Sequence, residues 1–131
     1  MTSLKDQTVL VIGRGSGLAR AIALAAQDAG AQVIAAGRGR EALAAAYAGE
    51  PGISTETVDL TDEPSIAALG ERLGTLDHVV STASARARGR VADLDRDAIR
   101  LSFDTKVIGP LMLAKHLATQ TLHIDGGEPL T

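Results

Sequence analysis

Residues 8–38, TVLVIGRGSGLARAIALAAQDAGAQVIAAGR, decide the fold of this chain. The run VLVI is unbroken, apolar and β-prone, as expected of a strand buried on both faces. Three glycines within five residues follow it, and then an alanine- and leucine-rich run ends at Gly30, a residue suited to the left-handed position after a helix. AQVIAA reads as a second buried strand. The stretch therefore predicts one βαβ unit with its glycines at the first strand-to-helix turn, where backbone N–H groups can bind a phosphate.

The same alternation of strands and helices continues along the chain. We expect strands at 8–12, 32–36, 53–60, 76–82 and 120–124, and helices at 16–29, 41–47, 61–73 and 95–117. Thr61 is the expected N-cap of the third helix, and Pro110 is expected to kink the last one. Strands that alternate with helices predict a doubly wound parallel α/β sheet in a single three-layer domain covering residues 1–131. A right-handed crossover would place the last strand beside the fourth, so the expected order is 3-2-1-4-last.

Composition narrows the class of protein. The 131 residues suit one domain, and with one Phe, one Tyr and no Trp its core must be aliphatic. A net charge of −3 with mixed charges gives no indication of a nucleic-acid or anionic-membrane partner. The absence of cysteine excludes disulfides and zinc–thiolate sites. No apolar stretch is long enough for a membrane span, so we expect a cytoplasmic protein.

The glycine spacing is more specific than the glycine content. Gly13, Gly17 and Ala19 fit the pattern G-x-x-x-G-x-[GA]. This resembles the nucleotide loop of the short-chain dehydrogenase/reductase family, G-x-x-x-G-x-G. The resemblance implies a Rossmann-like fold, a bound NAD or NADP, and hydride transfer between a carbonyl and an alcohol. The glycines alone leave open a turn that binds no ligand.

The resemblance also implies which residues contact the cofactor. The pyrophosphate would lie on the loop, and Asp59, which with Leu60 ends the third strand, would meet the adenine amino group. From sequence alone, Asp59 reads almost equally well as an acid at a helix start. The fourth strand ends STAS, where the family usually has Asn-Asn-Ala-Gly, and only the alanine matches. The implied cofactor-binding residues are Gly13, Arg14, Gly15, Ser16, Gly17, Leu18, Arg38, Asp59, Leu60, Ser81 and Ala83.

The end of the second strand indicates which dinucleotide fits. An acidic residue there would bind the ribose hydroxyls of NAD and repel a 2′-phosphate. This chain has Gly37, Arg38, Gly39 and Arg40 instead, and Arg14 in the glycine turn can face the same place. Because guanidinium groups bind phosphate well, the pattern favours NADP over NAD. The alternative is that Arg38 and Arg40 are simply solvated.

The catalytic part of the family pattern is missing. The family's Tyr-x-x-x-Lys occurs nowhere in the sequence, and Lys106 stands where the family has an Asn, three residues before Gly109. A charged lysine cannot accept the hydrogen bonds that an Asn accepts. Residues 119–127, TQTLHIDGG, resemble the family's last strand and Asp-Gly-Gly turn. The family-like blocks 8–118 and 119–127 therefore join at an apparent internal deletion. No catalytic residue can be assigned, since Ser81, Ser84 and Lys106 lack an evident activating partner.

Other polar groups carry weaker indications. The resemblance places Arg86, Arg88 and Arg90 in a loop near the active-site mouth, where they either contact an anion or are solvated. The three histidines have no ligand-like spacing and read as structural, and no metal site is expected.

Three hypotheses follow from the sequence. The first is a truncated, NADP-binding oxidoreductase with a small carbonyl or alcohol substrate and little or no turnover. The second is a nucleotide-binding module without catalysis. The third is an interaction fragment, because helix 95–117 carries Ile99, Phe103, Val107, Leu111 and Leu113 and resembles the helix through which the family dimerises. The resemblance of this helix implies a homodimer or higher homo-oligomer.

Overall fold

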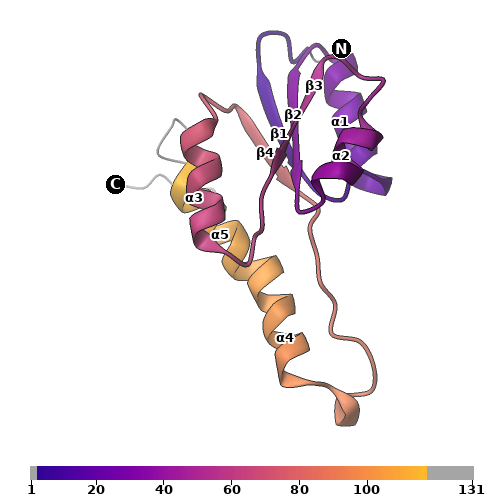
Figure 1. Cartoon of the computed structure of the whole chain (residues 1–131), viewed down its shortest axis with the longest axis vertical. Coiled ribbons are helices and arrows are strands. Elements are labelled where there is room, and N and C mark those ends of the chain that lie inside the picture. Colours follow the sequence, from indigo (N-terminus) through magenta and orange to yellow (C-terminus); the bar gives the residue numbers. More distant parts are fainter. Residues whose placement is uncertain (1–2, 118–131) are drawn as a thin grey trace.

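Four parallel strands form the sheet in the computed structural model, which describes residues 3–117 (Figure 1). They are β1 (Thr8–Ile12), β2 (Gln32–Gly37), β3 (Ile53–Thr57) and β4 (His78–Ser81). Their order is β3-β2-β1-β4, with Val9 paired to Val33 on one side and to His78 on the other. This confirms the predicted Rossmann-like parallel fold. The expected last strand at 120–124 lies outside the described residues.

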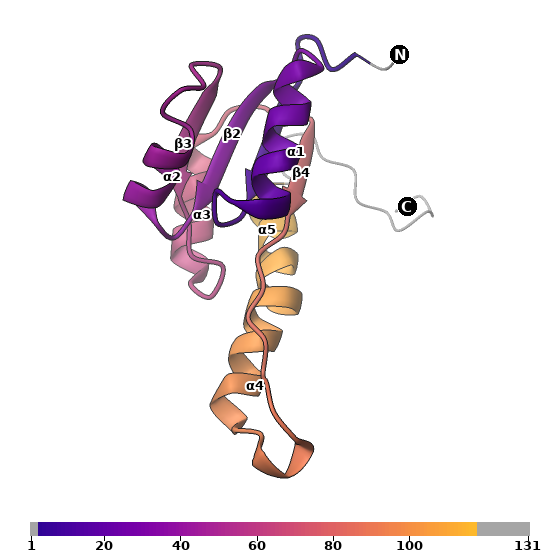
Figure 2. The same ribbon diagram turned by 90° about the vertical axis from the view of Figure 1, so that its right-hand side faces the viewer.

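Helices cover both faces of this sheet (Figures 1 and 2). One face carries α1 (Gly17–Asp28) and α2 (Arg40–Ala46), and the other carries α3 (Glu63–Arg72) and α5 (Gly109–Leu117). Val9 and Val11 of β1 belong to the cluster under α1 and α2, whereas Leu10 and Ile12 belong to the cluster under α3 and α5. The period-2 alternation of a strand thus divides the unbroken VLVI run between two cores.

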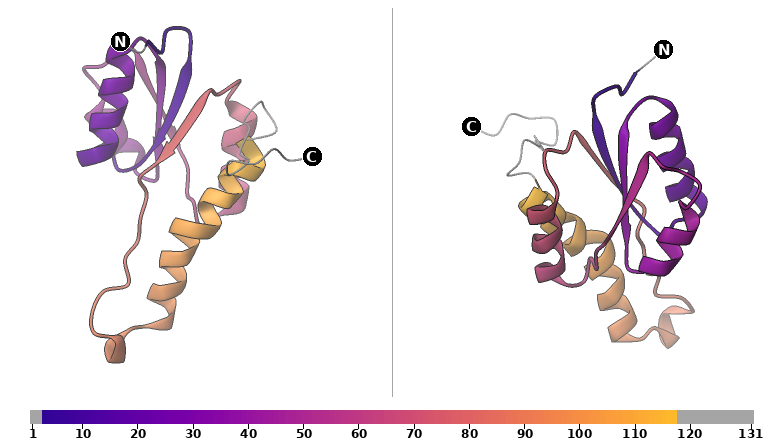
Figure 3. Two further views of the ribbon diagram at one scale, coloured as in Figure 1. Left: turned by 180° about the vertical axis from the view of Figure 1, so that it is seen from behind. Right: turned by 45° about the horizontal axis from the view of Figure 1, so that its top comes forward.

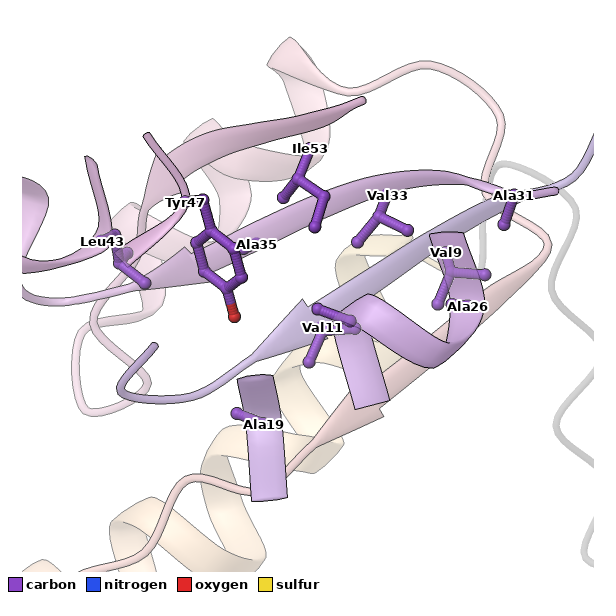
Figure 4. Close-up of a cluster of buried hydrophobic side chains, with 11 residues drawn as sticks. Val9, Val11, Ala19, Ala26, Ala31, Val33, Ala35, Leu43, Tyr47 and Ile53 are labelled. Carbon is purple, nitrogen blue, oxygen red and sulfur yellow. The ribbon is translucent and has the colours of Figure 1, made fainter. Parts of the chain in front are cut away.

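The two cores are built from different side chains. The first is made mainly of alanine and valine, with Tyr47 as its only aromatic side chain (Figure 4). Its three buried helix residues on α1, Ala19, Ala23 and Ala26, let that helix lie close to the sheet. The second core is leucine- and isoleucine-rich, and Ile66 and Leu69 of α3 are fully buried in it. Both cores are aliphatic apart from Tyr47, as the composition predicts.

An arm leaves the sheet after β4. Residues 82–90 run away from the strands to the short 3-10 helix Val91–Asp93, and α4 (Arg96–Phe103) leads back toward α5 (Figures 1 and 3). Within residues 3–117, β4 pairs with β1 alone, so its other edge has no strand partner. Asp95 caps α4 by accepting from the Ala98 N–H at 3.3 Å.

Several element boundaries differ from the sequence prediction. β3 ends at Thr57 rather than residue 60, and β4 spans only four residues. Asp62, not Thr61, is the N-cap of α3, and its carboxylate accepts from the Ser65 N–H at 3.2 Å. The prediction of Thr61 was wrong because two adjacent residues can both cap, and here the threonine hydroxyl bonds to Asp59 instead.

The predicted long helix is also interrupted. Residues Asp104–Ile108 form a π-helix between α4 and α5, in which the Gly109 N–H donates to the Asp104 carbonyl five residues earlier. Pro110 explains this position. It lacks an N–H, and in a regular α-helix its ring would meet the Lys106 carbonyl, so a wider turn relieves the clash. The proline expected to kink the helix is therefore the second residue of α5, next to the end of the π-helix.

Val11 and Val91 provide a matched test of the core. Val11 is 1% exposed in β1, and Val91 is 86% exposed on the arm. We expect Val11→Ala to lower the free energy of unfolding by about 2 kcal/mol, because it removes buried apolar surface and leaves a cavity. Val91→Ala should change it by less than about 0.5 kcal/mol. Urea unfolding followed by circular dichroism measures both, and equal effects would contradict the assigned core.

Candidate functional site

A cavity of about 420 Å³ lies at the carboxyl ends of the strands. Ile12 ends β1 and Gly37 ends β2, while Val58 and Ala83 follow β3 and β4. Since β1 lies between β2 and β4, the chain leaves neighbouring strands toward opposite faces here, which is where ligands bind in open parallel sheets. The lining residues are Ile12, Gly13, Arg14, Gly37, Arg38, Gly39, Ala42, Leu43, Val58, Asp59, Leu60, Thr61, Ala83, Ser84, Ala85, Leu101 and Thr105.

Gly13 is the position where the surrounding elements meet. A Cβ there would lie 2.5 Å from both the Ala19 Cβ of α1 and the Thr82 Oγ1 after β4. A Cβ on Gly37 would collide with the Gly13 carbonyl oxygen. Both positions therefore require glycine. The Gly13 N–H donates to the Ala36 carbonyl at 3.0 Å, which ties the turn to the end of β2.

The other two glycines of the turn adopt backbone conformations that favour glycine. Gly15 has φ +76° and Gly17 has φ +59°, a region that side-chain-bearing residues rarely adopt. Gly17 starts α1, so the turn leads directly into a helix N-terminus, the expected arrangement for an anion-binding loop. Among the residues proposed from sequence for the pyrophosphate, Gly13 and Arg14 line the cavity. Gly15, Ser16, Gly17 and Leu18 do not line it.

The structure places the three arginines near the end of β2 at two different cavities. Arg14 and Arg38 both line the large cavity, whereas Arg40 lines a smaller one of about 160 Å³ with Thr55, Glu56 and Thr57. Two guanidinium groups thus stand at one cavity, and Arg40 belongs elsewhere. This distinction was not visible in the sequence, where Arg38 and Arg40 are separated by a single glycine.

Asp59 is the acidic group of the cavity. The Thr61 Oγ1 donates to the Asp59 Oδ1 at 2.7 Å, and the Thr61 N–H donates to the same oxygen at 2.9 Å. These hydrogen bonds lower the pKa of Asp59, since they favour its charged form. Burial acts in the opposite direction, and the Arg38 charge adds a smaller lowering. Asp59 is therefore an anion at neutral pH.

The end of β4 and the π-helix complete the wall. Leu60, Ala83 and Ser84 line the cavity, but Ser81 does not. Lys106 is exposed and is not among the lining residues, whereas its neighbour Thr105 is 9% exposed and lines the cavity. Sequence reasoning missed Thr105, Thr61 and Leu101. Thr61 could have been noticed, because a Thr two residues after an Asp can bond to its carboxylate.

The remaining polar residues lie outside this cavity. Arg86, Arg88 and Arg90 are exposed on the arm, and Arg90 pairs with Asp93 at 2.9 Å. His78 lies 2.8 Å from the Gln7 side chain. His116 and Lys115 of α5 both contact Glu63 Oε2 at 2.8 Å, which ties α5 to the start of α3. Within residues 3–117, no cluster of His, Asp or Glu side chains is arranged to hold a metal ion, and no helix is long and apolar enough to cross a membrane.

The fold and this cavity define a Rossmann-type α/β protein with a nucleotide-binding type of strand-to-helix turn. The sequence profile of the family described as short chain dehydrogenase matches residues 7–128. The chain therefore belongs to the short-chain dehydrogenase family.

Individual relatives agree with this assignment. The chain is 36% identical over 106 residues to a 2-keto-3-deoxy-L-fuconate dehydrogenase of Xanthomonas campestris, a match that covers 81% of this chain and 35% of that protein. It is 37% identical over 110 residues to a 1-hydroxy-2-glutathionyl-2-methyl-3-butene dehydrogenase of Rhodococcus sp. strain AD45, covering 79% of this chain and 46% of the relative.

Solved structures give the same family. A short-chain type dehydrogenase/reductase from Mycobacterium ulcerans superposes with a TM-score of 0.81 at 32% identity, over 90% of this chain and 47% of the other. A second short chain dehydrogenase/reductase family protein has a TM-score of 0.85 at 28% identity, over 91% and 51%. The chain thus spans about half the length of these structures, and less than half of the two enzymes above.

Gly13 and Gly49 test the convergence of elements at the turn. We expect Gly13→Ala to lower the free energy of unfolding by about 1–3 kcal/mol, because its Cβ would push α1 and the end of β4 apart. Gly49→Ala is the control, since a Cβ there meets no atom within 4 Å. Urea unfolding of both variants measures the difference. A Gly13→Ala variant as stable as the control would contradict the close approach described above.

Proposed function

We propose that this chain binds NADP(H) in the cavity at the strand ends, with NAD(H) as the weaker ligand. The observation that carries this proposal is the placement of Arg14 and Arg38 together at one cavity, with no acid at the end of β2. Two guanidinium groups at this place attract a 2′-phosphate, whereas an acid would repel it.

Each part of the cofactor has a plausible partner in the chain. The glycine turn, residues 13–18, supplies backbone N–H groups and a helix N-terminus for the pyrophosphate. Arg14 and Arg38 bind the 2′-phosphate, and Asp59 with Leu60 lies at the adenine. Ala83, with Ser81 as the less favoured neighbour, lies at the nicotinamide-side ribose. Small side chains there leave room for a cofactor to lie across the end of β4.

The proposed reaction class is the family's hydride transfer between a carbonyl and an alcohol. The bound nicotinamide supplies or accepts the hydride, and the protein must orient it and handle a proton. In this chain Ser84 lines the cavity, but no described base or acid lies in hydrogen-bonding contact with it. We therefore propose that turnover is weak or absent and that the chain acts mainly as a nucleotide-binding module.

Arg38 and Arg40 give a matched test of cofactor choice. We expect the protein to bind NADPH more tightly than NADH, and Arg38→Ala to weaken NADPH binding about tenfold with little change for NADH, as loss of a charged hydrogen-bonding partner predicts. Arg40→Ala removes the same charge away from the cavity and should have little effect. Nicotinamide fluorescence reports binding, since the chain has no tryptophan.

The titration also shows how the proposal can fail. A protein that is folded by circular dichroism and binds neither cofactor would contradict nucleotide binding. Equal losses in the Arg38→Ala and Arg40→Ala variants would contradict the assigned phosphate site. Steady NADPH oxidation after addition of a carbonyl compound would contradict the impaired turnover.

A second function, self-association through the arm, is favoured by its exposed apolar side chains. Phe103, Val107 and Leu111 are 59%, 46% and 61% exposed and follow one another at intervals of four residues. One of these side chains comes from α4, one from the π-helix and one from α5, and together they form the apolar stripe. Neighbouring exposed apolar side chains of this kind are typical of a protein–protein interface. We propose that two copies of the chain pair through this stripe.

Leu111 and Leu18 test this association. Both leucines are more than half exposed, Leu111 on α5 and Leu18 on α1. We expect the wild-type chain to be dimeric, Leu111→Asp to be monomeric because a charge enters the apolar stripe, and Leu18→Asp to remain dimeric. Size-exclusion chromatography with light scattering measures the mass of each. A wild-type monomer at high protein concentration would contradict the proposal.

A further inference from the structure

Thr105 is a polar side chain buried in the wall of the large cavity. It is 9% exposed, and it lines the cavity together with Leu101 of α4 and Leu60 after β3. In the part of the chain that the structure describes, its hydroxyl makes no hydrogen bond. A threonine in a regular helix can bond back to the carbonyl four residues earlier, but Thr105 lies in the π-helix and makes no such bond.

The unpartnered hydroxyl opens toward the cavity. Within residues 3–117, every side-chain nitrogen or oxygen that is sealed from solvent in a buried residue has a hydrogen-bond partner. The Thr105 oxygen has none, so it is not sealed, and the open space beside it is the cavity that Thr105 lines. A hydroxyl in this position has lost most of its hydrogen bonding to bulk water, which costs stability. It therefore points to a ligand that supplies the missing partner.

The start of α5 fixes Thr105 at this wall. A Cβ on Gly109 would lie 2.9 Å from the Cβ and the carbonyl oxygen of Leu60 and from the Asp104 carbonyl oxygen. The helix therefore lies directly against Leu60, which follows β3. Since β3 is next to β2 in the sheet, this contact places Thr105 on the same side of the cavity as Arg38, which follows β2.

The side chains around Thr105 limit the chemistry of the ligand. Arg14 and Arg38 suit a phosphate. Leu60 and Leu101 are apolar and suit the face of a ring, whereas the Thr105 hydroxyl can donate or accept a hydrogen bond at the edge of that ring. The lining thus suits a phosphate joined to a ring that carries a neutral nitrogen or oxygen at its edge.

We propose that Thr105 is a specificity-determining residue, whose hydroxyl forms a hydrogen bond with a neutral ring nitrogen or oxygen of a phosphorylated nucleoside in this cavity. The inference rests on the proposed nucleotide binding and extends it to a residue of the π-helix. The hydroxyl has no partner in the free protein, and the ligand provides one. Thr105 therefore favours binding at a cost to the stability of the free protein.

The first experiment needs no ligand. Thr105→Val keeps the shape of the side chain and removes the hydroxyl, so it should lower the equilibrium constant of unfolding about threefold by removing an unpartnered polar group. Thr82→Val is the matched contrast. The Thr82 hydroxyl donates to the Ile12 carbonyl at 3.2 Å, so its removal should raise that constant about threefold. Urea unfolding followed by circular dichroism measures both. A Thr105→Val variant less stable than the wild type overturns the inference, because the hydroxyl would then have a partner in the free protein.

The second experiment measures binding by nicotinamide fluorescence, directly for NADPH and by displacement of NADPH for adenosine 2′,5′-bisphosphate and inorganic phosphate. We expect Thr105→Val to weaken binding of NADPH and of the bisphosphate about fivefold each, as loss of one hydrogen bond predicts, and to leave phosphate binding unchanged. Thr105→Ser keeps the hydroxyl and should bind all three as the wild type does. Thr75→Val, which removes an exposed hydroxyl outside the cavity, is the control.

The outcomes separate this inference from the function beneath it. A wild-type protein that binds neither NADPH nor the bisphosphate overturns the proposed function, and this inference with it. Equal weakening of all three ligands by Thr105→Val overturns the inference alone, since it shows a general disturbance of the cavity. So does a Thr105→Val variant that binds NADPH or the bisphosphate as tightly as the wild type. If Thr105→Val does not fold, Thr105→Ala takes its place in the binding experiment.

Discussion

The close approach of backbone at Gly13 is the constraint on which the rest of the structure depends. At this residue the end of β1 meets the start of α1 and the segment after β4, both within contact of where a Cβ would be, and the Gly13 N–H donates to the Ala36 carbonyl in β2. A single added carbon would separate these elements. Because the elements converge, the carboxyl ends of the strands form one shared cavity wall, and residues from distant parts of the sequence can act on the same ligand.

Much of the fold follows from the sequence because local and global preferences agree. The VLVI run, the glycine turn and Gly30, with φ +100°, each predict the element that the structure contains. The details that could not be predicted depend on choices between neighbours. Asp62 and Thr61 are both good caps, and only packing of α3 decides that Asp62 caps while Thr61 bonds to Asp59. Residue type alone does not distinguish these arrangements.

The candidate site was predictable to a similar extent. Of the residues that the sequence indicated, six line the cavity: Gly13, Arg14, Arg38, Asp59, Leu60 and Ala83. Five do not line it: Gly15, Ser16, Gly17, Leu18 and Ser81. The sequence could not separate Arg38 from Arg40, because that depends on where β2 stops and α2 begins. It also could not indicate Thr105, which faces the cavity from a π-helical turn. The wider turn before Pro110 changes which side chains share a face, and the regular helical period that sequence reasoning assumes does not hold there.

The cavity carries more positive than negative side chains, and this charge distribution determines which kind of ligand suits it. Arg14 and Arg38 provide two cations, while Asp59 provides one anion whose charge is maintained by Thr61. The charge of Arg38 also lowers the pKa of Asp59, by less than the hydrogen bonds from Thr61 do. A ligand with a phosphate at one place and a hydrogen-bond donor at another gives each group its own partner. Such a ligand satisfies both kinds of charge, whereas a simple anion would leave Asp59 without a donor for its second oxygen.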